Sequence, residues 1–232
     1  MPVTPPEASD QPDPRRRRRI LIVDDHPMLR RGLAALLESV PGLTVCGEAA
    51  TRAAALEAVR AHPPDLVIVD LMLGDSHGLD LVKDLKIRHP GMPALVLSMH
   101  DEALYAERSL RAGARGYVTK QELDDTLLMA IQRVLAGDIY MSGKLQARLA
   151  AHFVAGPTPE TGATCEGMSD RELEVFRLIG QGQGTRQIAE ALHLSIKTIE
   201  SHREHLKQKL RLASGVELVH RATQWVEHEL AG

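Results

Sequence analysis

The sequence is poor in cysteine, since only Cys46 and Cys165 carry a thiol among its 232 residues. Two cysteines cannot build a disulfide framework or a cluster of metal-binding thiolates, and they favour a reducing compartment. No apolar run approaches the roughly 20 residues that a membrane-spanning helix needs. The N-terminus also lacks the apolar core of a secretory signal. These absences predict a cytoplasmic protein that has no membrane partner.

An excess of positive charge is missing as well. The formal net charge is −3 at pH 7, so any contact with nucleic acid has to come from a local basic face. Residues 1–18 form a predicted disordered tail, because Met1 to Pro14 is rich in proline and acidic residues and has few large apolar side chains. The run from Arg15 to Arg19 could contact nucleic acid, but we interpret it as a solvated lead-in to the first strand.

Short apolar segments alternate with helical patterns between residues 19 and 137. Strands are expected at 20–23, 43–49, 66–69, 94–97 and 116–119, and helices at 28–39, 52–61, 79–88, 102–112 and 123–136. Alternation of this kind predicts βαβ units and a parallel sheet. Because the strands are continuously apolar, both faces of the sheet should be covered. Residues 19–137 are therefore expected to form a doubly wound α/β domain with five strands.

The C-terminal part has only helical patterns. A linker is expected at 138–167, with a further helix at 142–154 and a segment rich in Gly, Pro and Thr at 155–167. Residues 168–232 then form a predicted all-α domain, with helices at 171–180, 185–192, 196–210 and 216–228. Ser169 and Glu172 have the spacing of a capping box at the start of its first helix.

Polar residues follow four of the expected strands. In open α/β sheets ligands bind at the carboxyl ends of the strands, and these ends carry Asp24, Asp25, Asp70, Ser98 and Lys120. Clustered carboxylates repel one another unless a cation is present, and Mg²⁺ with oxygen ligands suits them. Each residue alone would be interpreted as a cap, a turn or a surface residue. All five together predict a site that binds Mg²⁺ and a phosphoryl group.

Several segments resemble the receiver domain of two-component response regulators: Ile-Leu-Ile-Val-Asp-Asp-His, Leu-Val-Ile-Val-Asp-Leu, Leu-Ser-Met-His-Asp and Gly-Tyr-Val-Thr-Lys. The resemblance implies a flavodoxin-like fold with strand order 2-1-3-4-5. It also implies that Asp70 accepts a phosphoryl group from a histidine kinase, without enzymatic turnover. Mg²⁺ would be bound by Asp24, Asp25, Asp70 and the backbone carbonyl of Met72. Ser98 and Tyr117 would form a switch pair, and Lys120 would contact the phosphoryl group.

One segment departs from the family pattern. Many members read Met-Pro-Gly-Met-Asp-Gly after the phosphoacceptor, whereas this chain has Met72-Leu73-Gly74-Asp75-Ser76-His77-Gly78. The missing proline leaves the loop less constrained in φ. Asp75 adds a carboxylate there, which we interpret as a turn residue rather than a metal ligand. Tyr117 could likewise be a half-buried strand aromatic instead of a switch residue.

The expected helix at 196–210 is amphipathic. At about 100° per residue, one side carries Ile196, Ile199, Leu206 and Leu210. The opposite side carries Lys197, Glu200, Ser201, Glu204 and Gln208. This polarity alone is also typical of an ordinary surface helix.

The segments Ser-Asp-Arg-Glu-Leu-Glu-Val, Gln-Ile-Ala-Glu-Ala-Leu and Ser-Ile-Lys-Thr-Ile-Glu-Ser-His resemble the LuxR-type helix-turn-helix of the NarL/FixJ subfamily. The resemblance implies a transcription regulator that binds double-stranded DNA. The implied phosphate contacts are Lys197, Thr198, Arg203 and Lys207, and the implied base contacts are Glu200, Ser201 and Glu204. The stripe of Val216, Val219, Thr223 and Val226 resembles a dimer-forming helix, although it could instead pack within its own domain.

Three other functions are less well supported. A regulator that binds DNA independently of phosphorylation would not need the complete acidic set. A metal-dependent phosphatase would need an acid or base beside Asp70, which Leu71 and Met72 do not supply. RNA binding would favour interleaved stacking aromatics, which the helix at 196–210 lacks. We therefore predict a DNA-binding regulator that dimerises when Asp70 is phosphorylated.

Overall fold

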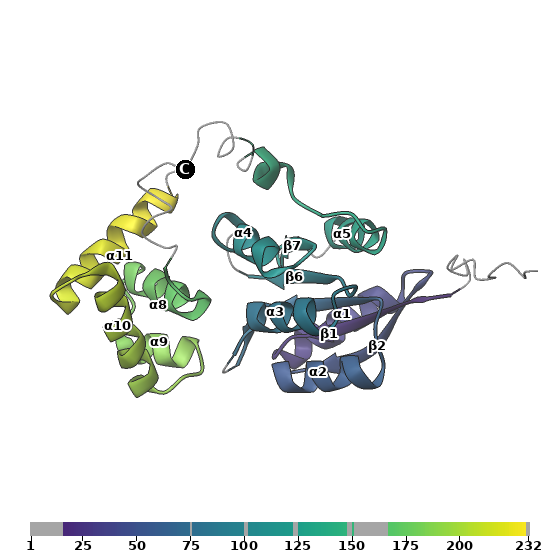
Figure 1. The fold of residues 1–232 in the computed structure, drawn as a ribbon, viewed down its shortest axis with the longest axis horizontal. Helices are drawn as coiled ribbons and strands as arrows, with labels where there is room; N and C mark the ends of the chain where they lie inside the picture. The colour runs from purple at the N-terminus through teal and green to yellow at the C-terminus, as the bar shows by residue number, and fades with distance from the viewer. Residues whose placement is uncertain are drawn as a thin grey trace, which may run out of the picture.

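The computed structural model describes residues 16–74, 76–99, 102–122, 125–147, 150 and 167–230. Its first domain contains a five-stranded sheet in the order β2-β1-β3-β6-β7 (Figure 1). The strands are β1 (Arg18–Val23), β2 (Leu43–Ala49), β3 (Leu66–Asp70), β6 (Ala94–Ser98) and β7 (Gly116–Thr119). Neighbouring strands all pair in parallel. The predicted order 2-1-3-4-5 is confirmed, since β6 and β7 are the fourth and fifth strands of this sheet.

Helices cover both faces of the sheet. The helices are α1 (Pro27–Glu38), α2 (Arg52–Ala61), α3 (Gly78–Arg88), α4 (Glu102–Ala112) and α5 (Asp125–Leu135). Along β1, Ile20 and Ile22 are buried with side chains of α1 and α5, whereas Leu21 and Val23 are buried with side chains of α2, α3 and α4. Successive strand residues point to opposite faces, and here both faces are covered. This arrangement explains why the strands are apolar without alternation.

A short hairpin follows Asp70, where the sequence predicted only a loop. It consists of β4 (Met72–Leu73) and β5 (Ser76–His77), which pair antiparallel. Strands of two residues are too short to produce a recognisable period, which explains the missed prediction. Gly74 has a φ of +58°, a left-handed conformation that suits glycine. Gly74 thus forms this turn, and Leu73 takes the place of the proline in the family pattern. Asp75 lies outside the described residues.

After the hairpin, the chain passes close to the backbone of Asp70 at Gly78. The Gly78 N–H donates to the Leu71 carbonyl over 2.6 Å. A Cβ at position 78 would lie 1.9 Å from the Asp70 carbonyl oxygen, closer than any van der Waals contact. Helix α3 can therefore begin at this point only if residue 78 has no side chain.

The second domain is helical, as predicted. It consists of α8 (Asp170–Gly180), α9 (Thr185–Ala191), α10 (Ile196–Leu210) and α11 (Gly215–Leu230). The predicted capping box is present: Ser169 Oγ accepts from the Glu172 N–H over 3.3 Å, and Glu172 Oε2 accepts from the Ser169 N–H over 2.7 Å. Phe176 of α8 packs against Trp225 of α11 with ring centroids 5.5 Å apart.

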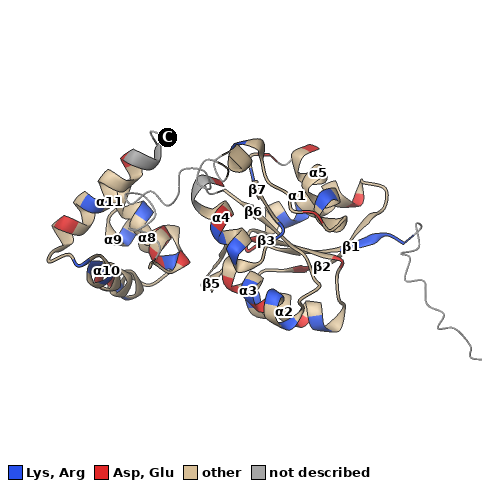
Figure 2. Ribbon diagram, turned by 45° about the horizontal axis from the view of Figure 1, so that its top comes forward, with Lys and Arg blue, Asp and Glu red and all other residues tan. Residues whose placement is uncertain are grey.

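The domain boundaries differ in detail from those expected. Strand β1 begins at Arg18, so the last residue of the predicted tail is part of the sheet domain. Figure 2 shows the described part of the arginine run in blue at the start of β1. Arg16 and Arg18 each lie 3.8 Å from Asp65, which favours a structural lead-in. Of the predicted helix at 142–154, residues 143–147 and 150 are helical, and 148–149 and 151–154 lie outside the described residues. The segment 155–166 and the tail before residue 16 lie outside the described residues. Within the parts described, no helix is long and apolar enough to span a membrane.

We expect Gly78→Ala to lower the free energy of unfolding of the sheet domain by about 1–3 kcal/mol, because the added methyl group must displace backbone at Asp70. Denaturation followed by near-UV circular dichroism of the tyrosines measures this domain, since Tyr105, Tyr117 and Tyr140 all lie within it. Gly91→Ala is the matched control, because nothing lies within 4 Å of a Cβ at that exposed position. Equal stability of the two variants would contradict the steric argument.

Candidate functional site

The carboxyl ends of the strands bring together an acidic cluster and a lysine. Asp24 follows β1, Asp70 ends β3 and Lys120 follows β7. The Lys120 Nζ lies 2.6 Å from Asp24 Oδ2 and 2.6 Å from Asp70 Oδ2. All three side chains are buried. The structure therefore places three charged residues, predicted from separate segments, in one contact network.

Burial controls the protonation of Asp70. It raises the pKa of this carboxyl from 3.8 to about 6, the Lys120 ammonium opposes the rise, and the Asp24 carboxylate adds to it. A hydrogen bond from the Met72 N–H also favours the ionised form. Asp70 is therefore ionised at neutral pH, but it loses its charge at milder acidity than an exposed aspartate.

The cluster has the donor set of a hard divalent cation. Carboxylate oxygens of Asp24, Asp25 and Asp70 and a ring nitrogen of His26 lie within 4.8 Å of one another. Asp25 Oδ1 is buried, and a ring nitrogen of His26 lies 2.7 Å from it. Its Oδ2 accepts from the Gly74 N–H over 3.0 Å. Three carboxylates that meet at one point fit Mg²⁺, which prefers oxygen ligands.

His26 belongs to this cluster but was not predicted. Its ring Nδ1 lies 2.7 Å from Asp25 Oδ1 and 3.2 Å from Asp24 Oδ1. The main-chain N–H of His26 donates to Asp24 Oδ1 over 2.7 Å. The available signal was its place directly after Asp24 and Asp25 in the sequence. His26 also precedes α1 as the N-cap residue, which holds the ring beside the carboxylates.

Ser98 and Tyr117 lie next to the cluster on adjoining strands. Ser98 ends β6 and is fully buried, and its carbonyl accepts from the Lys120 N–H over 2.7 Å. Tyr117 on β7 is only 1% exposed, so its interpretation as a half-buried strand aromatic is wrong. Its ring is buried in the same core as Tyr105 of α4. A switch role for the pair stays a prediction.

Helix α10 presents the predicted polar face to solvent. Lys197, Glu200, Ser201 and Glu204 are exposed, whereas Ile199 and Leu206 are buried in the domain core. Thr198, Arg203 and Lys207 are half-buried at the sides, and Lys207 pairs with Glu204 at 2.7 Å. Ile196, predicted on the buried face, is 43% exposed because it is the first residue of the helix and extends beyond the core.

The valine stripe of α11 is divided between core and solvent. Val216 and Val219 are 79% and 40% exposed, so packing within the domain is wrong for this half of the stripe. Thr223 and Val226 are half-buried. The helix is held to its domain by Leu218, Ala222 and Trp225 instead. An exposed apolar strip at the start of α11 is compatible with a dimer contact.

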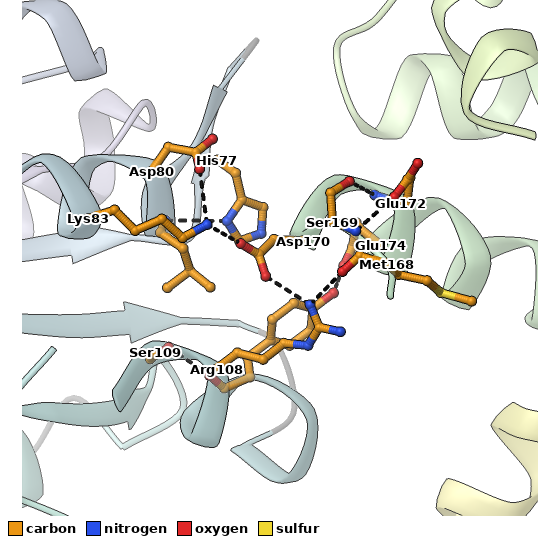
Figure 3. A network of polar contacts seen from close by, with 12 residues as sticks. His77, Asp80, Lys83, Arg108, Ser109, Met168, Ser169, Asp170, Glu172 and Glu174 are labelled. Carbon is orange, nitrogen blue, oxygen red and sulfur yellow. Dashed lines mark hydrogen bonds and ion pairs between the residues drawn. The ribbon is translucent and has the colours of Figure 1, made fainter. Parts of the chain in front are cut away.

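The two domains contact each other through α8, a feature that no sequence pattern indicated (Figure 3). The Asp170 carboxylate lies 3.0 Å from Lys83 Nζ of α3 and 3.0 Å from Arg108 Nη1 of α4. Glu174 is 1% exposed and accepts a hydrogen bond from the Tyr105 hydroxyl. Each of these residues is an ordinary polar residue of its own helix, and only the docking of the domains pairs them.

Comparisons with known proteins show which family the chain belongs to. A model of the response regulator receiver domain matches residues 20–132, and a model of bacterial regulatory proteins of the LuxR family matches residues 166–222. The oxygen regulatory protein NreC of Staphylococcus carnosus (strain TM300) is 36% identical over 206 residues, covering 87% of this chain and 94% of NreC. The chain belongs to the LuxR-type response regulators. It is a phosphorylation-controlled transcription regulator, so the predicted function class is confirmed.

Solved structures of the family have the same architecture. A LuxR-family response regulator from Aurantimonas sp. SI85-9A1 is 35% identical, covers 60% of this chain and 99% of its own, and has a TM-score of 0.56. RcsB from Salmonella enterica serovar Typhimurium, bound to promoter rprA in the presence of phosphomimetic BeF₃⁻, is 26% identical. That match covers 89% of this chain and 98% of RcsB, with a TM-score of 0.57. The flavodoxin-like receiver and the helix-turn-helix domain are thus both confirmed.

The raised pKa of Asp70 predicts a pH-dependent stability of the receiver. Its neutral form stabilises the fold below the unfolded pKa near 3.8, and this contribution is lost as the pH rises through about 6. Without divalent cations, the free energy of unfolding of Asp70→Asn relative to that of the parent should therefore rise by about 2 kcal/mol from pH 4 to pH 7. Urea titrations followed by tyrosine circular dichroism measure the difference. Asp138→Asn, at an exposed position, is the control for the loss of a carboxylate. A difference between Asp70→Asn and the parent that does not change with pH would refute the shifted pKa.

Proposed function

We propose that Asp70 is the phosphoacceptor of this response regulator and that a histidine kinase is the donor. The observation that carries the proposal is the Lys120 ammonium held 2.6 Å from both Asp70 and Asp24. An ammonium in this position matches a phosphoryl oxygen as a point charge. The site would act in the cytoplasm, where a kinase can reach it.

Asp24, Asp25 and Asp70 would hold Mg²⁺ together with the Met72 carbonyl. The bound ion would neutralise part of the negative charge on the incoming phosphoryl group. Asp70 supplies the attacking carboxylate oxygen, which forms the new bond to phosphorus as the bond to the donor histidine nitrogen breaks. Lys120 stabilises the charge on the phosphoryl oxygens. Ser98, at the end of the neighbouring strand, would donate its hydroxyl to one of these oxygens while Tyr117 repacks.

The output domain would bind double-stranded DNA through α10. Lys197, Thr198, Arg203 and Lys207 would contact phosphates, and Glu200, Ser201 and Glu204 would contact base edges. RcsB is a relative whose solved structure has a promoter bound. Phosphorylation would favour a homodimer through the exposed valines of α11, so that two copies of α10 address two half-sites.

Phosphoryl uptake tests the acceptor assignment. We expect the parent to gain one phosphoryl group from phosphoramidate and Mg²⁺, and Asp70→Asn to gain none, because an amide is not a nucleophile. Intact-protein mass spectrometry measures the addition. Asp138→Asn, which alters an exposed carboxylate outside the acidic cluster, should react like the parent. If the parent takes up no phosphoryl group, DNA binding independent of phosphorylation becomes the better description.

DNA affinity tests the contact assignment. Lys197→Ala should weaken binding to all sequences alike and lower the slope of log affinity against log salt by about 1, since one phosphate contact is lost. Fluorescence anisotropy at several salt concentrations measures both. Lys144→Ala, an exposed lysine outside the helical output domain, is the control for net charge. An identical change in the two variants would show that Lys197 makes no specific contact.

A further inference from the structure

Arg171, the second residue of α8, lies between the two domains. Its Nη2 donates to the Leu192 carbonyl of its own domain over 3.0 Å and to the Gly74 carbonyl of the receiver over 3.1 Å. Its Nη1 lies 3.7 Å from Met72 Sδ. One guanidinium of the output domain therefore holds the β4-β5 hairpin that follows the proposed phosphoacceptor.

The two hairpin residues that Arg171 contacts also contact the acidic cluster. The Gly74 N–H donates to Asp25 Oδ2 over 3.0 Å, and the Met72 N–H hydrogen-bonds to Asp70. Gly74 is also in a left-handed conformation, with φ of +58°. Arg171 and the carboxylates thus contact the same two residues of this short segment. Any movement of the hairpin alters both sets of contacts together.

Neighbouring contacts fix the position of α8. Arg108 Nη1 donates to the Met168 carbonyl over 3.1 Å in addition to its pairing with Asp170 (Figure 3). Glu174 also pairs with Arg177 of its own helix at 2.8 Å, beside its hydrogen bond to Tyr105. His77 of the hairpin is buried and stacks on Tyr105 with ring centroids 6.2 Å apart. Buried polar groups that are paired in this way define a single docked position.

We infer that Arg171 is a positioning residue for the phosphorylation loop, and that docking of α8 lowers the affinity of the acidic cluster for divalent cations. Two effects act in the same direction. The guanidinium brings positive charge near the cation site. It also holds Gly74 in the position where the Gly74 N–H donates to Asp25 Oδ2. Because coupling between sites is reciprocal, a cation or phosphoryl group that draws the loop inward also weakens docking. The inference rests on the proposed cation site.

Calorimetric titration of the full chain with Mg²⁺ alone tests this inference. Arg171→Ala should bind Mg²⁺ roughly five-fold more tightly than the parent, a coupling of ordinary size. Arg108→Ala breaks the docking from the receiver side and should act in the same direction, even if Arg171→Ala disturbs α8. The matched controls are Arg186→Ala, at an exposed position of α9, and Arg111→Ala, whose guanidinium pairs with Glu107 within α4. Both controls should bind Mg²⁺ like the parent.

Small-angle scattering of the same samples should show a larger radius of gyration for Arg108→Ala, because its domains separate. Parental Mg²⁺ affinity in Arg171→Ala, whatever Arg108→Ala does, overturns the positioning role. Weaker Mg²⁺ binding in either variant would mean that docking raises the affinity for the cation, which also overturns the inference. A parent that binds no Mg²⁺ removes the proposed cation site as well. A parent that binds Mg²⁺ but takes up no phosphoryl group contradicts the proposed function and leaves this inference standing.

Discussion

The ammonium of Lys120 between Asp24 and Asp70 is the interaction on which the receiver depends. Two buried carboxylates that approach the same point repel each other strongly in a medium of low polarisability. Lys120 offsets this repulsion at 2.6 Å from each. Removing the ammonium would leave uncompensated charge in the protein interior, which costs several kcal/mol. The parallel sheet makes the arrangement unavoidable, because it brings the ends of β1, β3 and β7 to one rim.

Further polar contacts connect the acidic cluster to the output domain. Asp25 is held by the backbone of Gly74, and Gly74 is held in turn by Arg171 of the output domain. The hairpin can adopt this position because Gly74 has a left-handed backbone and because Gly78 has no side chain that would clash with the Asp70 carbonyl. A chain of polar contacts thus runs from the strand ends to α8. Its members belong to both domains, so the acidic site is not isolated from the output domain.

Docking through α8 leaves the polar face of α10 exposed, as well as the apolar strip formed by Val216 and Val219 of α11. Docking therefore does not by itself block the DNA contacts proposed for α10. Under the proposed function, control would act on how two output domains are placed relative to each other. This view fits a regulator in which α8 fixes the output domain on its receiver until the phosphorylation loop moves. The pairing of α8 with α3 and α4 is the element whose equilibrium both sites can bias.

The sequence by itself predicted the five strands of the parallel sheet and the helices around them, the strand order by resemblance, and Asp24, Asp25, Asp70 and Lys120 as neighbours at the strand ends. These features are local or follow from topology: apolar runs mark strands, and parallel strands bring Asp24, Asp70 and Lys120 to one rim. Only the tertiary structure revealed the β4-β5 hairpin, the place of His26, and the pairing of Arg171 with Gly74 and of Glu174 with Tyr105. Such contacts join residues far apart in the chain whose types are common on any helix surface. Nothing in their own neighbourhood distinguishes them, because their partners are selected by the docking of complete domains.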